Sequence, residues 1–516
     1  MDYFILLLIC WGSIFVNTSL FTDTQIFPKW LCFFAGILLY GFYIGLKGFP
    51  KKKDSKIPIL LSTIVILCTM QALYGIGQSM HGALMGTKSF ITGSFDNTAG
   101  FASCIVAGVP FLLGIKTNKR VRIVVVSIAG IALLLSSSRS GIIAGCVILA
   151  LLFFRTRTAL KWKIAMSLLL LFVFIASVTY FKTDSVKGRM LIWRCTLDLI
   201  NSDIWLGQGW GAFAAHYMDV QANYFMRHPD SGYAFFADNV THPFNEILSV
   251  LVVGGLFGFA VLLLYIFFLF YCYKKAPSDV GIASLLSLVG IFVCSLFSYP
   301  FTYPFTWFIV LLSSWILIHN AFHELLISSG MKLLMRACIL LIVSFGTLGL
   351  CDRIKAELSW KHTYEYVTNI DERLSAYKSL INRLGENPFF LYNYAIELYK
   401  AKHYNDCLLV AQRCRDYWAD YDLELLLGNT CQELNQLQEA ELHYQEAARM
   451  CPIRFLPMYR LALLYRKWGK MEKSDSIARE ILHKPIKVLS PEISAIKTEM
   501  QLQLDGNLDN FCDILE

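Results

Sequence analysis

Residues 121–155 read VRIVVVSIAGIALLLSSSRSGIIAGCVILALLFFR, two apolar runs on either side of Ser136-Ser137-Ser138-Arg139-Ser140-Gly141. Two apolar runs joined by a short polar turn predict a pair of membrane-spanning helices. Arg139 lies in that turn, where a charge is costly unless an anion, a carboxylate or water meets it. Arg139 therefore marks a candidate functional site, and a phosphate-bearing lipid is a ligand that would suit it.

The composition extends the membrane interpretation to most of the chain. Of 516 residues, 56% are hydrophobic and only 16% are charged, and the mean hydropathy is +0.51. These values exclude an ordinary soluble globular protein. Because a bilayer core takes roughly 20 apolar residues per helix, we expect about eleven spans, with ten or twelve as alternatives. The expected spans lie near residues 3–20, 30–46, 57–76, 99–115, 121–136, 141–155, 163–181, 244–272, 281–298, 304–322 and 332–351.

Lysine and arginine are distributed unevenly between alternate loops. One set of short loops carries most of the positive charge, at Lys47, Lys51, Lys52, Lys53, Lys56, Lys116, Lys119, Arg120, Arg122, Arg155, Arg157, Lys161, Lys163, Lys274, Lys275 and Lys332. The opposing short loops carry only Lys29, Lys88 and Arg139. By the positive-inside rule the first set is cytoplasmic, so we expect a cytoplasmic N-terminus. The net charge of +8 then reflects topology and is no evidence for nucleic-acid binding.

Two polar segments interrupt or follow the spans, and an odd number of spans places both outside the cytoplasm. One is a large loop at residues 182–241, within a membrane domain of residues 1–353. The other is a tail at residues 354–516, where the composition shifts toward Glu, Lys, Arg, Gln and Tyr. The expected fold class is therefore all-α, a polytopic membrane helical bundle followed by a soluble helical domain.

The tail repeats itself at a period of 33 to 34 residues. The pattern of small and aromatic positions occurs at Gly428, Ala440, Tyr444, Ala447 and Pro452, and returns at Ala395, Tyr404, Cys407 and Ala411 and at Ala462, Tyr465, Gly469 and Ser474. These offsets resemble the tetratricopeptide repeat over residues 365–485. An unrelated array of helical hairpins is the alternative. The resemblance implies a concave groove that binds peptides or a partner protein.

The fifteen cysteines form no Cys-x-x-Cys pair and no Cys/His spacing typical of a metal site. We therefore predict neither a metal site nor a disulfide framework, and no cofactor.

Four motifs fall on the side of the membrane where the large loop is expected. They are Thr92-Gly-Ser-Phe-Asp-Asn-Thr-Ala-Gly-Phe-Ala102; Ser138-Arg139-Ser140-Gly141; Gly188-Arg189-Met-Leu-Ile-Trp193-Arg194 with Leu206-Gly-Gln-Gly-Trp-Gly-Ala-Phe213; and Thr241-His242-Pro243-Phe244-Asn245-Glu246 with Gly254-Gly255-Leu-Phe-Gly258. Because these motifs occur in this order, the chain resembles the O-antigen ligase superfamily over residues 60–310. That superfamily includes lipopolysaccharide O-antigen ligases, O-antigen polymerases and bacterial protein O-oligosaccharyltransferases.

The resemblance implies transfer of a glycan from undecaprenyl diphosphate to an acceptor hydroxyl, outside the bacterial cytoplasmic (inner) membrane and without a metal. Arg139 and Arg189 are then the candidates for the diphosphate clamp, because guanidinium groups bind phosphate oxygens bidentately. Pairing with a structural carboxylate or a lipid headgroup is the alternative for both. Arg194, five residues beyond Arg189, is expected on another helix face as a secondary contact.

Asn97 and Asn245 are the remaining substrate-binding candidates, although Asn97 could equally cap a helix. The run Gly207, Gly209 and Gly211 could cradle a phosphate, but it lacks the sequence context of such loops and is better explained as a tight turn. His242 is the first candidate for a general base, because its ordinary pKa of about 6.5 suits proton removal at neutral pH.

The sequence departs from the family at the base, since Phe244 occupies the position where the family usually has histidine. Glu246 or Asp238 could replace His242 as the base, and catalysis dominated by the arginines with no strong base is a further alternative. The predicted function is an inverting glycan transferase whose acceptor is lipid A-core or protein, with a polysaccharide polymerase as the alternative. A transporter or a non-catalytic peptide-binding scaffold is the alternative from another class. If the tail only recognises the acceptor, a chain ending near Arg353 should still bind the donor.

Overall fold

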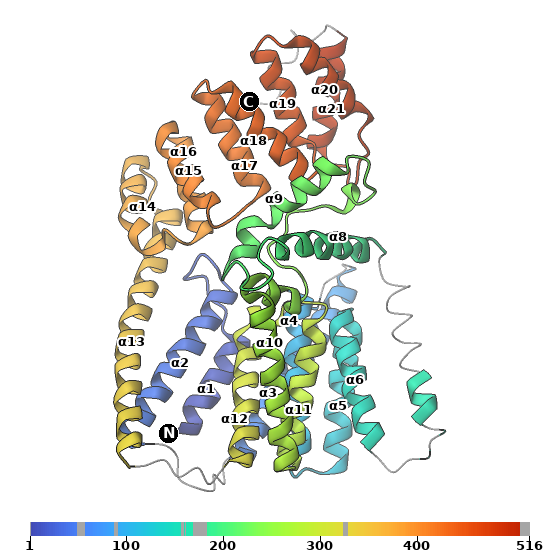
Figure 1. Ribbon diagram of the computed structural model, residues 1–516, viewed down its shortest axis with the longest axis vertical. Helices are drawn as coiled ribbons and strands as arrows, with labels where there is room; N and C mark the ends of the chain where they lie inside the picture. The colour runs from blue at the N-terminus through green and yellow to red at the C-terminus, as the bar shows by residue number, and fades with distance from the viewer. Residues whose placement is uncertain are drawn as a thin grey trace. The chain divides into compact units, whose positions relative to one another are not determined.

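The computed structural model describes residues 2–48, 57–86, 91–155, 183–322 and 329–505, together with residues 159, 161 and 163–168. All regular elements of these residues are helices, which confirms the all-α prediction (Figure 1). The chain divides into two compact units. Unit 1 comprises Met1–Phe181, Phe244–Ile247 and Ala260–Lys361, and unit 2 comprises Lys182–Pro243, Leu248–Phe259 and His362–Glu516. The large loop therefore belongs with the tail in unit 2.

Unit 1 contains, or shares with unit 2, the helices that correspond to the predicted spans. They are α1 (Asp2–Phe15), α2 (Ile26–Lys47), α3 (Ile57–Leu84), α4 (Thr98–Gly108) with the 3-10 helix η1 (Val109–Gly114), α5 (Lys119–Leu135), α6 (Arg139–Arg155), α10 (Glu246–Lys275), α11 (Asp279–Ser295), η3 (Pro300–Thr302), α12 (Pro304–Ala321) and α13 (Ser329–Tyr366).

Among the described residues, α2, α3, α10, α12 and α13 are long and apolar enough to cross a membrane, and α1, α4 with η1, and α11 are shorter apolar helices. The chain is therefore a multi-pass membrane protein. The count of eleven spans stays a prediction. Most of the seventh expected span, residues 163–181, lies outside the described residues, as do Lys51, Lys52, Lys53, Lys56, Lys88 and Arg157.

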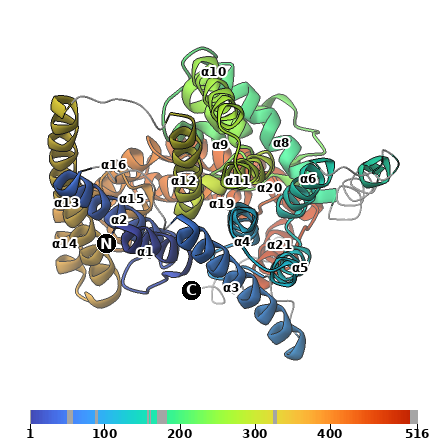
Figure 2. The same cartoon turned by 90° about the horizontal axis from the view of Figure 1, so that it is seen from below.

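Helix α4 lies at the centre of unit 1, against α3, α6, α11 and α12 (Figure 2). Every residue of α4 from Gly100 to Gly108 is buried. Small residues allow this close packing, as in other membrane helices. A Cβ added at Gly100 would lie 2.5 Å from the Tyr303 ring, and one at Gly108 would collide with the Cys68 sulfur.

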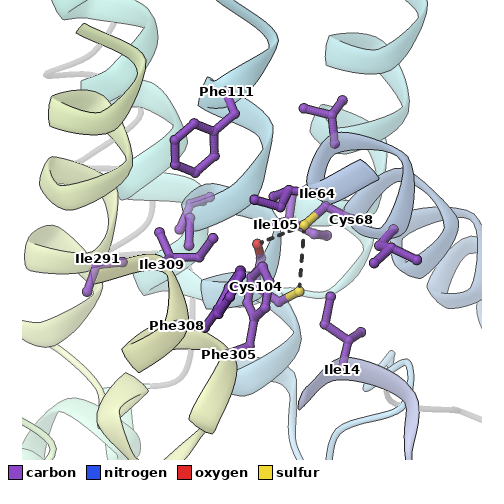
Figure 3. Close-up of a cluster of buried hydrophobic side chains, with 14 of the residues drawn as sticks. Ile14, Ile64, Cys68, Cys104, Ile105, Phe111, Ile291, Phe305, Phe308 and Ile309 are labelled. Carbon is purple, nitrogen blue, oxygen red and sulfur yellow. Dashed lines mark hydrogen bonds between the residues drawn. The ribbon is translucent and has the colours of Figure 1, made fainter. Parts of the chain in front are cut away.

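The core of unit 1 surrounds α4 with branched aliphatic and aromatic side chains (Figure 3). The Cys68 sulfur lies 4.0 Å from the Cys104 sulfur, so these two cysteines pack as thiols. All the cysteines of the described residues are free.

Unit 2 consists of the large loop and the tail. The loop forms α8 (Thr183–Ile200), α9 (Ala212–Arg227) and the 3-10 helix η2 (Ala234–Phe236). The tail forms α14 (Ile370–Leu384), α15 (Pro388–Lys400), α16 (Tyr404–Arg415), α17 (Tyr421–Glu433), α18 (Leu437–Met450), α19 (Leu456–Lys467), α20 (Met471–His483) and α21 (Pro491–Leu504).

Consecutive tail helices pack in pairs, α15 with α16, α17 with α18, and α19 with α20. The small residues of the sequence repeat lie at the crossings. A Cβ added at Gly428 of α17 would lie 2.5 Å from the Tyr444 ring of α18, and Ala395, Ala440 and Ala462 are fully buried. This arrangement fits the spacing that predicts tetratricopeptide repeats, and that assignment stays a prediction.

Candidate active site

The first motif supplies the N-terminus of α4. Asn97 adopts an extended backbone, and its Oδ1 accepts hydrogen bonds from Ala99 N (2.9 Å) and Gly100 N (2.8 Å). Asn97 thus caps α4, as one of its two sequence interpretations expects. Its remaining donor, Nδ2, points to the Tyr299 hydroxyl at 3.0 Å.

Two tyrosines that lie in none of the four sequence motifs flank this cap. Tyr299 precedes η3 and Tyr303 precedes α12, and the Tyr303 hydroxyl donates a hydrogen bond of 2.6 Å to Asp96 Oδ1. They belong to a direct duplication, Tyr-Pro-Phe-Thr-Tyr-Pro-Phe-Thr at residues 299–306. That duplication is the signal in the sequence that could have identified them.

The fourth motif reaches the same cluster. Phe244 has a left-handed backbone (φ 52°), and its ring meets the Tyr299 ring edge-on at 5.2 Å. Asn245 Oδ1 accepts from Ile247 N at 2.9 Å, at the start of α10. Glu246 Oε1 accepts from Phe301 N at 3.4 Å. Unit 1 therefore brings Asn97 and Phe244 to the same residue, Tyr299, and Glu246 to Phe301 two residues further on, while Asn245 caps α10.

Arg139 is the first residue of α6, after a left-handed Ser137 (φ 53°). Ser138 and Ser140 on either side of Arg139 are buried, with their hydroxyl oxygens 3.3 Å apart. At Gly141, a Cβ would collide with the Ala102 methyl group of α4, so α6 and α4 begin at the same end of unit 1. A helix N-terminus carries unpaired N–H groups and a partial positive charge, and Arg139 adds a full charge to it. This end of unit 1 is suited to an anion.

Among the short loops expected outside the cytoplasm, Lys29 is the other described cation, and it has a structural role. Its side chain is buried, and its ammonium group donates to Asn17 Oδ1 (2.5 Å), Gln25 O (3.0 Å) and Ser94 O (2.8 Å). Lys29 thus ties the start of α2 to the loop that precedes Asn97.

Arg189 and His242 lie in unit 2, on α8 and on the segment that leads to α10. Trp193 Nε1 donates a hydrogen bond of 3.0 Å to Pro243 O. Arg189 and Trp193 are four residues apart and share one face of α8. Helix α8 therefore presents Arg189 on the face that holds the backbone next to His242. Arg194 is exposed and lies over the Tyr224 ring at 5.3 Å.

The segment before His242 is held by the tail. Asp238, the alternative base, forms an ion pair with Arg454 at 2.8 Å, and Asn239 Nδ2 donates to Asp420 Oδ2 at 2.5 Å. Asp420, the acceptor of Asn239, is itself buried, and burial raises its pKa to about 6. These contacts make Asp238 a residue that fixes the loop to the tail.

Gln221 of α9 is the buried centre of the contact between loop and tail. It is fully buried, and its Nε2 donates to Met450 O of α18 at 2.7 Å and to Asp238 O at 3.2 Å. Its Oε1 accepts from the Tyr217 hydroxyl at 2.7 Å. Ala419 N also donates to Ala214 O at 2.9 Å. The loop and the tail are thus joined by side chains and by backbone.

A charged network surrounds this contact. Arg415 of α16 pairs with Asp219 of α9 and donates to Glu424 Oε1 at 2.5 Å, while His443 Nδ1 lies 2.7 Å from Glu424 Oε2. Burial alone would lower the pKa of His443, but bonds to Cys431 and Glu424 outweigh it and raise the pKa to about 9. His443 is therefore protonated at neutral pH, and it balances the buried Glu424.

The glycine run of the third motif is a turn. Gly207, Gly209 and Gly211 all have positive φ (70°, 86° and 87°). The amides of Gln208 and Gly209 donate to the carbonyls of Val252 (2.8 Å) and Val253 (3.0 Å) in α10. The tight-turn interpretation is confirmed, because these amides bind protein carbonyls.

Residues 123–263 match a family model described as O-Antigen ligase. The matched stretch includes Arg139, Arg189, His242, Asn245 and Glu246, while Asn97 lies before it. The match confirms the resemblance of this part of the chain to the O-antigen ligase superfamily, and it supports membrane glycosyl transfer of the ligase or polymerase type. No curated protein matches the chain.

Proposed function

We propose that this protein transfers a glycan from undecaprenyl diphosphate to an acceptor hydroxyl on the extracytoplasmic face of the bacterial inner membrane. The observation that carries the proposal is Arg139 at the N-terminus of α6, within the O-antigen ligase match. A diphosphate leaving group needs positive charge as its bond to the sugar breaks, and a guanidinium group beside helix amides supplies it.

In the proposed reaction the acceptor oxygen attacks the anomeric carbon from the side opposite the diphosphate. A bond forms between that oxygen and the sugar, and the sugar–phosphate bond breaks. The electron pair stays on the diphosphate, which Arg139 and Arg189 neutralise, so the sugar configuration inverts. His242 or Glu246 takes the acceptor proton. The reaction as proposed uses no metal.

The acceptor class follows from glycan analysis of a disrupted strain. Lipopolysaccharide and protein fractions are blotted for the glycan, with complementation by the intact gene as the control. Loss of the glycan from protein or from lipid A-core identifies the acceptor. A shortened glycan ladder on an unchanged acceptor would instead identify a polymerase, and unchanged glycans in every fraction would contradict transfer altogether.

The proposed orientation follows from the asymmetry of Lys and Arg between loops. Reporter fusions after Lys53 and Arg157 should report the cytoplasm, and fusions after Asp230 and Tyr421 should report the extracytoplasmic side. Paired alkaline phosphatase and fluorescent reporters at each site control for expression. A cytoplasmic signal after Tyr421 would contradict both the odd span count and the location of the tail.

A further inference from the structure

Helix α10 is broken at Gly255, whose backbone is left-handed and non-helical (φ 57°, ψ −157°). A break of this kind leaves helix amides and carbonyls without their usual partners four residues away. At this break the carbonyls of Val252 and Val253 lose the amides of Leu256 and Phe257. Four backbone groups would then be unpaired in an apolar helix, where each is costly.

Residues 204–211, which we call the glycine loop, supply all four partners. Gln208 N and Gly209 N donate to Val252 O (2.8 Å) and Val253 O (3.0 Å). In return, Leu256 N and Phe257 N donate to Ile204 O (2.9 Å) and Trp205 O (3.1 Å). The glycine loop thus supplies one new partner for each of the four backbone groups that the two missing helix hydrogen bonds leave.

Glycines on both sides make this contact possible. A Cβ added at Gly207 would lie 2.6 Å from Gly255 N, and a Cβ at Gly255 would collide with the Trp205 carbonyl. Two more amides of the loop are paired, Leu206 N with Asp203 Oδ1 (3.3 Å) and Gly207 N with Asp203 O (3.1 Å). The amides from Leu206 to Gly209 are thus all paired, as a non-helical segment close to lipid requires.

The side chains of the glycine loop are large, apolar and exposed. Trp205 is 70% exposed, Leu206 69% and Trp210 89%, and Phe257 beside them on α10 is 68% exposed. A patch of this kind on a protein surface marks a place where something apolar covers it. Gln208, the polar residue among them, turns inward and donates to Leu199 O at 2.7 Å.

The position of the break along α10 indicates what covers the patch. From Leu256 to Tyr273 the helix has 18 residues, about 27 Å at about 1.5 Å per residue, and it ends at Lys274 and Lys275. That length is close to the roughly 30 Å thickness of a bilayer core. With the two lysines at one membrane surface, Gly255 lies at the other. Tryptophan, like tyrosine, is enriched at that depth.

We propose that the glycine loop inserts into the outer membrane–water interface, with Trp205, Leu206 and Trp210 in contact with lipid. The large loop, which carries Arg189 and His242, is then held at the membrane surface by lipid contact as well as by α10. This inference goes beyond glycan transfer, and it stands or falls independently of the reaction.

The test compares the intact protein with a Trp205→Phe/Trp210→Phe variant in nanodiscs of purified phospholipid. Phenylalanine keeps the apolar contacts of the two tryptophans. The fluorescence of the intact protein minus that of the variant, which we call the difference emission, therefore comes from Trp205 and Trp210. We expect that emission to fall several-fold with lipids brominated near the headgroup, and less with lipids brominated near the chain end. Aqueous iodide should not quench this difference emission. Trp468→Phe in the tail is the matched control, whose difference emission should not respond to bromine.

Two results would overturn the proposal. Quenching of the difference emission by iodide and not by bromolipids would place the glycine loop in water. Protection from both quenchers would mean that protein, such as a second copy of the chain, covers the patch. Size-exclusion profiles of both variants that match the intact protein show that the comparison is between folded proteins.

Discussion

Replacing Arg139 with alanine should reduce glycan transfer by on the order of 100-fold or more, the size of effect typical for loss of one group that stabilises a leaving anion. Arg189→Ala should do the same. Arg139→Lys should recover little, because an ammonium group is a point charge and does not reproduce the planar fork of a guanidinium group. The measurement is transfer by purified protein from undecaprenyl-diphosphate glycan, at matched amounts of folded protein.

The chain offers a matched control for each arginine. Arg155 closes α6 at the end opposite Arg139, and Arg194 lies on α8 but contacts the Tyr224 ring. Arg155→Ala and Arg194→Ala should retain near-normal transfer. If the Arg139 and Arg189 alanine variants transfer as well as these controls, neither arginine binds the diphosphate.

Removing the tail should abolish donor binding together with transfer. The sequence alone predicts that a chain ending near Arg353 keeps donor binding, but the loop that carries Arg189 and His242 is packed on the tail in unit 2. Without α18, Gln221 loses the Met450 carbonyl. Without Asp420 and Arg454, the segment before His242 loses its side-chain partners. We therefore expect the loop of the shortened chain to be disordered.

A point variant tests the same contact in the full chain. Gln221→Ala leaves Met450 O buried without its donor, at about 1–3 kcal/mol, and the Tyr217 hydroxyl loses its acceptor Gln221 and keeps only Cys195. Hydrogen exchange at residues 238–242 and proteolysis of the loop should both accelerate, and transfer should fall. Asn223→Ala, at an exposed position of the same helix, is the control. Unchanged exchange and transfer in Gln221→Ala would show that the tail does not position the loop.

The sequence predicted best what depends on local pattern. Apolar runs located most of the helices of unit 1, and the turn at Arg139 begins a helix as its position between two runs suggests. Asn97 was ambiguous because an amide that precedes a helix can cap it or bind a ligand, and only the Ala99 and Gly100 contacts show that it caps. The glycine run makes a positive φ at Gly207 predictable, whereas the sequence does not predict that Gly207 contacts Gly255 in α10.

What the sequence missed depends on contacts between distant segments. Tyr299 and Tyr303 meet Asn97 and Asp96 from about two hundred residues away, and no local spacing connects them. The contact between α9 and the tail has the same origin. Gln221 in the sequence is one polar residue of an ordinary amphipathic helix, and its partner Met450 acts through a backbone carbonyl, which carries no residue signature.

The buried joint between α9 and α18 also limits how this protein can diversify. A tail brought in from a relative would have to present a carbonyl to Gln221, an acceptor to Asn239 and a cation to Asp238. Recombination at the junction after α13 would separate these partners and leave the fully buried Gln221 without its Met450 acceptor. New acceptor preferences should therefore arise when residues 212–239 and 415–454 change together, and engineered hybrids should exchange the two segments as one set.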